Sequence, residues 1–171
     1  MCPLRGQSLE SRLAAQPSVV QALWLRGIKR MTESGPSTAN ARSWVDLQAW
    51  IDDSRKYDSW ENWPDVVSSV LARGSQDGLH LCFRVGQGML DIIFSTAAHH
   101  GLEDEPRVLL VRRGRTSTEV AYWSEATGSV CETVANESLY PALLRQLARL
   151  WTTSKPGEKL PNALIREEGM S

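Results

Sequence analysis

Residues 107–135 read RVLLVRRGRTSTEVAYWSEATGSVCETVA, and this stretch decides the fold. It contains three short strand-like runs, which are separated by turn signals at residues 112–117 and 126–128. The first run, Val108–Val111, is apolar on both faces, as is expected of a central strand. Because the connections are short, neighbouring strands are expected to pair in antiparallel fashion.

The preceding stretch adds two strands to this sheet. Residues 79–85 alternate between apolar and polar side chains, which is the period of a half-buried strand. Gly86–Gly88 then forms a tight turn into the run Met89–Thr96, so the two segments predict a hairpin. A phosphate-binding loop would open a helix instead, and none follows here. The sequence therefore predicts an antiparallel meander of five strands.

A strongly amphipathic helix follows the last strand. Asn136 or Ser138 can cap it, and Pro141 fits its first turn. At 100° per residue, one apolar stripe gathers Leu139, Tyr140, Leu143, Leu144, Leu147, Leu150 and Trp151. This stripe predicts that the helix packs on one face of the sheet.

Two further helices are predicted before the sheet. The first is expected from about residue 44 to residue 56 with Ser43 as its N-cap, and the second from Pro64 to a stop at Gly74. The fold class is therefore α+β, with two N-terminal helices, a five-stranded antiparallel meander and a C-terminal amphipathic helix packed on the sheet. Since that last helix can cover only one face, we expect the N-terminal helices to cover the middle of the other.

The domain boundaries are expected at residues 41 and 153. Residues 1–40 are interpreted as a disordered or wrongly assigned N-terminal extension and linker, and residues 154–171 as a flexible polar tail. Met31 is a candidate start for the chain. The alternative is that the basic residues 1–30 form a targeting segment, because they can form an amphipathic helix.

Composition excludes several classes of protein. The chain has 171 residues, 42% of them hydrophobic, and a formal net charge of −1. No run of about 18 apolar residues predicts a membrane-spanning helix, and the balanced charge makes a general nucleic-acid binder unexpected. Cys2, Cys82 and Cys131 are odd in number and widely spaced, which favours free thiols in the cytoplasm.

No pattern of residues predicts catalysis, metal binding or a cofactor. His99 and His100 with the acids at 103–105 form the densest titratable cluster, but the spacing is not that of metal ligands and a solvated loop is favoured. His80 and Cys82 share one face of a predicted strand, and packing is favoured over a thiol–imidazole pair. We therefore expect no catalytic residue, metal ligand or cofactor, and whether the chain is an enzyme stays open.

Tryptophan and arginine supply the candidate binding residues. Seven tryptophans occur, and both residue types are favoured at interfaces. The partner-binding candidates are Trp50, Trp60, Trp63, Arg112, Arg113 and Arg115. The leading hypothesis is a small non-catalytic interaction protein of immunity-protein, chaperone or adaptor type, with a protein partner or a second copy of the chain. The alternative is a ligand-binding or enzymatic domain with a cavity between the sheet and the last helix.

Overall fold

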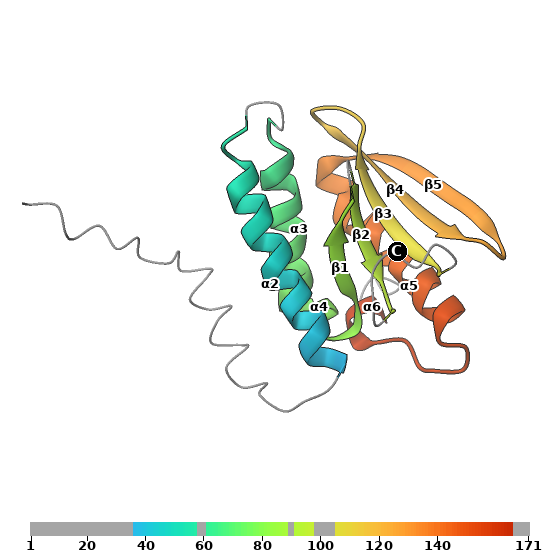
Figure 1. Ribbon diagram of the computed structural model, residues 1–171. Helices are drawn as coiled ribbons and strands as arrows, with labels where there is room; N and C mark the ends of the chain where they lie inside the picture. The colour runs from blue at the N-terminus through green and yellow to red at the C-terminus, as the bar shows by residue number, and fades with distance from the viewer. Residues whose placement is uncertain (1–35, 58–60, 89–90, 98–104, 166–171) are drawn as a thin grey trace, which may run out of the picture. The chain divides into compact units, whose positions relative to one another are not determined.

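The computed structural model of the chain describes residues 36–57, 61–88, 91–97 and 105–165, which all lie in the compact unit Glu33–Ser171. The elements are α2 (Pro36–Ser54), α3 (Trp63–Asp77), α4 (Leu79–Cys82), β1 (Arg84–Gln87), β2 (Asp91–Ser95), β3 (Arg107–Arg112), β4 (Ser117–Ser124), β5 (Gly128–Ala135), η2 (Asn136–Ser138), α5 (Leu139–Ser154) and α6 (Asn162–Ile165) (Figure 1). The predicted α+β class is confirmed. Among the helices of these described ranges, none is long and apolar enough to cross a bilayer.

The five strands form the predicted meander. Their order is β1-β2-β3-β4-β5, and every neighbouring pair is antiparallel. The register places Val85, Phe94, Val108, Tyr122 and Val130 in one row across the sheet. Because side chains alternate along a strand, this row and the row through Ile92, Leu110 and Val120 point to the same face.

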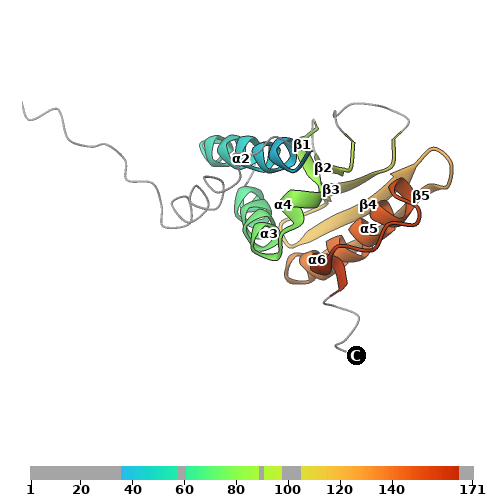
Figure 2. The same ribbon diagram turned by 90° about the horizontal axis from the view of Figure 1, so that it is seen from below.

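Helix α5 covers that face. It contacts β3, β4 and β5, and Figure 2 shows it on one side of the sheet together with α6. The predicted apolar stripe is buried, and Leu143, Leu147 and Leu150 are fully so. Each such side chain contributes about 1.5–3 kcal/mol relative to an exposed position. The prediction of an amphipathic C-terminal helix packed on the sheet is confirmed.

Helices α2, α3 and α4 close the β1 edge of the sheet. Helix α2 contacts β1, α3 and α4. The fully buried indole of Trp44 donates a hydrogen bond from Nε1 to the carbonyl of Phe83 at 2.7 Å, and its ring meets Phe94 edge to face. The Trp44 ring therefore joins α2 to the core at the β1 edge, and α2 contacts β1 but no other strand to a comparable extent. The expectation that the N-terminal helices cover the second face is therefore wrong.

The boundaries of three segments differ from the sequence-based expectation. Helix α2 begins at Pro36, so Ser43 lies inside it, where its hydroxyl donates to the carbonyl of Asn40 at 2.6 Å. Residues 79–82 form helix α4 instead of extending β1, because Gly78, at φ 87°, ends α3 in the left-handed region and a new helical turn follows. The end of the chain includes α6, in which Ala163 and Leu164 are buried. The expectations for residues 1–35 and 166–171 concern segments outside the described residues.

Candidate interaction surface

The second face of the sheet is not covered by any of the described helices (Figure 2). Its central row is formed by Gly86, Ile93, Leu109, Ala121 and Cys131, which lie opposite one another across the five strands. One flanking row contains Arg84, Ser95, Arg107, Trp123 and Ser129, and the other contains Asp91, Val111, Glu119 and Thr133. We name these three rows together the open face.

Apolar side chains occupy the middle of the open face. Ile93, Leu109, Val111 and Trp123 are half-buried, although the only cover they receive from the described residues comes from their neighbours on the sheet. An antiparallel sheet with one solvated face usually carries polar residues there. An uncovered apolar patch of this kind is typical of an interaction site.

Two arginines border the apolar patch. The Nε atoms of Arg84 and Arg107 are buried without a hydrogen-bond partner, and within the described ranges neither side chain forms an ion pair. The Arg107 guanidinium lies 4.5 Å from the centre of the Trp123 ring, which holds it against the sheet by a cation–π contact. A partly desolvated guanidinium with no carboxylate partner among the described residues can bind one from another molecule.

A groove of about 370 Å³ continues the open face towards α2. Its lining residues are Ser43, Asp46, Leu47, Trp50, Arg84, Val85, Gly86 and Gln87. The predicted candidate Trp50 is half-buried here, so the structure places it beside Arg84 in one groove. Trp50 is thus the one predicted tryptophan that the described residues place next to the open face.

The three predicted arginines of the β3–β4 hairpin are paired within the chain. Arg112 and Arg115 both bind the carboxylate of Glu61, and the Arg115 Nε is 2.9 Å from Glu61 Oε1. Arg113 contacts Glu119 through two hydrogen bonds of 2.9 and 3.1 Å, and these raise the pKa of its guanidinium. Arg112 and Arg115 therefore tie the hairpin to Glu61, whereas Arg113 pairs within the hairpin, and the three side chains do not form a free basic patch.

The two remaining tryptophan candidates do not reach the open face in the described residues. Trp63 is only 3% exposed and packs at the start of α3, where it belongs to the core. Trp60 lies outside the described residues. The histidines at 99 and 100, together with the acids at 103 and 104, also lie outside them.

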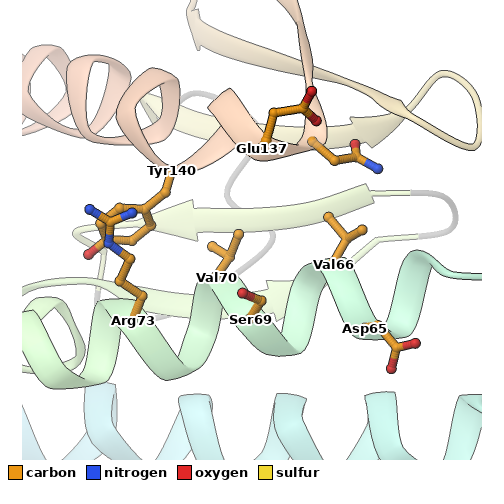
Figure 3. A pocket seen from close by; sticks show the side chains of 8 residues that line it. Asp65, Val66, Ser69, Val70, Arg73, Glu137 and Tyr140 are labelled. Atoms are coloured by element: carbon orange, nitrogen blue, oxygen red, sulfur yellow. The ribbon is translucent and has the colours of Figure 1, made fainter.

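A second groove of about 400 Å³ lies between α3 and the start of α5 (Figure 3). Val66 and Val70 form its apolar wall, and the Arg73 guanidinium lies 4.2 Å from the centre of the Tyr140 ring. The Tyr140 hydroxyl donates a hydrogen bond to Asp77 at 2.7 Å. This groove opens at the surface between two helices, whereas the predicted alternative placed a cavity between the sheet and α5.

The titratable side chains near α4 do not form a reactive pair. Burial lowers the pKa of His80, and a backbone hydrogen bond with Ser75 opposes this only in part. Burial also raises the pKa of the Cys82 thiol, which keeps the less nucleophilic protonated form. Both residues lie on the four-residue helix α4, where positions two apart point in different directions. Within the described part of the chain, no three or more His, Cys, Asp or Glu side chains could hold a metal ion.

Comparison with protein-family models, with curated proteins and with solved structures finds nothing that matches the chain. Sequence reasoning missed Arg84 and Glu61. Arg107 clusters in the sequence with the candidates Arg112, Arg113 and Arg115, and alternation along residues 107–111 places it on one face with Leu109 and Val111, so a signal for Arg107 was present. Glu61 gave no signal, because it binds arginines more than 50 positions away in the sequence.

Proposed function

We propose that the protein is a small non-catalytic interaction protein that binds a partner protein through the open face. The observation that carries this proposal is the combination of half-buried apolar side chains with Arg84 and Arg107, whose Nε atoms are buried and unpaired. Tryptophan and arginine dominate the binding energy of many interfaces. An apolar patch bordered by two arginines that form no ion pair with any described acid fits a partner surface that is apolar at its centre and acidic at one side.

Immunity proteins, chaperones and adaptors all act by binding another protein, and the proposed function includes these three classes. A protein partner is favoured over nucleic acid, because the hairpin arginines already bind Glu61 and Glu119 and two arginines alone make a small phosphate-binding surface. We place the protein in the cytoplasm, where the free thiols of Cys82 and Cys131 would stay reduced.

Site-specific photo-crosslinking in the native cell tests the proposal. A benzoylphenylalanine in place of Leu109 is expected to give a light-dependent adduct with a partner protein. The same group in place of Thr152, an exposed residue of α5, is the matched control and is expected to give none. The adduct at position 109 should weaken when Arg107→Glu is added. No adduct at position 109, or one that nuclease removes, would contradict the proposal.

A second candidate function is the binding of a small anion in the groove between α3 and α5. The favouring observation is Arg73, which is held against Tyr140 and forms no ion pair with any described carboxylate. A screen of small carboxylates and phosphates by NMR would show shifts of the amides around Arg73. Loss of these shifts in Arg73→Gln, with the open face unaffected, would support this function.

A further inference from the structure

The open face carries opposite charges at the two ends of its strands. Arg84 and Arg107 lie on one side of the central row, and we name this side the basic end. Asp91 and Glu119 lie on the opposite side, which we name the acidic end. Glu119 is bound by Arg113. Asp91 pairs with no cation among the described residues, just as the two arginines pair with no acid there. Among the described residues, the face therefore carries charges of both signs that form no ion pair with one another.

We propose that a second copy of this chain stacks on the open face about a twofold axis that runs along the central row. The inference rests on the open face being an interface, as the proposed function states. An axis in this direction keeps each strand over its own equivalent and reverses the strand direction. The basic end of each copy then lies over the acidic end of the other, as a self-complementary interface requires.

The register specifies which side chains meet. Asp91 on β2 is two residues from the central row on one side, and Ser95 on the same strand is two residues from it on the other. Asp91 of one copy therefore lies over Ser95 of the second copy. Arg84 and Arg107 flank that serine on β1 and β3, each about 4.8 Å away across the sheet. An arginine side chain spans this distance, so Asp91 of each copy comes within reach of Arg84 and Arg107 of the other.

The apolar residues supply the centre of the same interface. Ile93, Leu109 and Ala121 follow one another along the proposed axis on three neighbouring strands. The strands outline roughly 400 Å² per copy, or roughly 800 Å² for the pair, which is below a standard interface of about 1,600 Å². We therefore expect a weak and reversible dimer.

Sedimentation equilibrium of the full chain from about 5 to 500 μM tests the inference with two charge-reversal variants. The first is the double variant Arg84→Glu/Arg107→Glu, and the second is Asp91→Arg. In a dimer of either variant, position 91 of each copy faces like charges at positions 84 and 107 of the other copy. Each variant alone is therefore expected to raise the Kd of the dimer at least tenfold. Their equimolar mixture places opposite charges at both contacts and is expected to recover a Kd within about threefold of the unmodified chain.

A matched control separates this effect from net charge. The double variant Arg149→Glu/Lys159→Glu changes the net charge as much as the double variant above, but at exposed positions outside the open face. It is expected to dimerise like the unmodified chain. A monomer at 500 μM, or a dimer that ignores the charge reversals, would overturn the inference. A monomer that still gives an adduct with another protein at position 109 in cells would overturn the dimer but not the proposed function. If neither a dimer nor an adduct forms, the proposed function is overturned as well.

Discussion

Gly74 of α3 lies against the ring of Trp44, and its replacement by alanine tests how tightly α2 and α3 are packed. A Cβ at this position would lie 2.7 Å from Cη2 and 2.9 Å from Cζ3 of Trp44, and 3.3 Å from Cδ1 of Leu79. The indole cannot move away easily, because it is fully buried and its N–H binds the carbonyl of Phe83. Gly74→Ala must therefore displace packed core atoms.

The two opposing free-energy terms can be compared. Alanine in a helix interior gains about 1 kcal/mol over glycine from helix propensity. Overpacking of a rigid core costs about 1–3 kcal/mol, and two carbon contacts below 3.0 Å favour the upper part of that range. We expect a net loss of about 2 kcal/mol in the free energy of unfolding, or a Tm lower by about 8 °C.

A double-mutant cycle with Trp44→Phe isolates the contact. The smaller ring removes the atoms that a Cβ at Gly74 would meet, so Gly74→Ala is expected to stabilise the Trp44→Phe variant by up to about 1 kcal/mol. Trp44→Phe itself costs about 1–3 kcal/mol, because the buried Phe83 carbonyl loses its donor.

Urea unfolding followed by circular dichroism measures all four proteins. The matched control is Gly78→Ala, where φ is 87° and nothing lies within 4 Å of the new Cβ, so its backbone cost of about 1–2 kcal/mol should be equal in both backgrounds. An equal cost of Gly74→Ala with and without the indole would refute this account of the core.

Two further predictions concern the helix stripe and pH. Leu147→Asp is expected to prevent folding, since it places an unpaired charge at a fully buried position. Arg145→Asp should cost about 1 kcal/mol or less in the free energy of unfolding, because the Arg145 side chain is exposed in its ion pair with Glu132. Equal loss of the circular dichroism signal in both variants would contradict the assignment of the stripe. Burial lowers the pKa of His80 below its ordinary value of 6.5, so its contribution to stability is full above about pH 6.5 and is lost as the pH falls through the folded-state pKa. The free energy of unfolding, measured in urea, should therefore fall less steeply with decreasing pH in His80→Gln than in the unmodified chain. An unchanged pH dependence in this variant would count against His80 as its origin.

The periodic parts of the sequence were sufficient to predict the meander and α5. Alternation within residues 107–135 and the stripe around Leu147 each depend on local spacing, which directly determines which side chains share a face. The same rule misassigned residues 79–82. Leu79 and Leu81 fit a strand pattern, but the chain forms a helical turn in which Leu79 is buried and Leu81 is 40% exposed.

Long-range pairing was beyond the sequence analysis. The arginines of the hairpin were expected to be candidate binding residues, but Glu61 and Glu119 bind them, and only the folded chain shows which acid lies near which base. An apolar stripe on a helix likewise predicts that one side of the helix is buried, but it does not indicate which face or edge of the sheet the helix packs against. The placement of α2 at the β1 edge was therefore mispredicted, while the burial of Trp44, Leu47 and Ile51 was predicted.

The apolar faces of the described helices are already used. Helix α2 buries Trp44 and Ile51 at the β1 edge, α3 buries Val67 and Leu71, and α5 buries its stripe against β3 and β4. None of these helices has a second buried stripe to place on the open face. Burial of the apolar centre of that face therefore requires a surface outside the described segments. A second copy supplies one whose charges match by symmetry, because the arginines of each copy lie where the other presents Asp91.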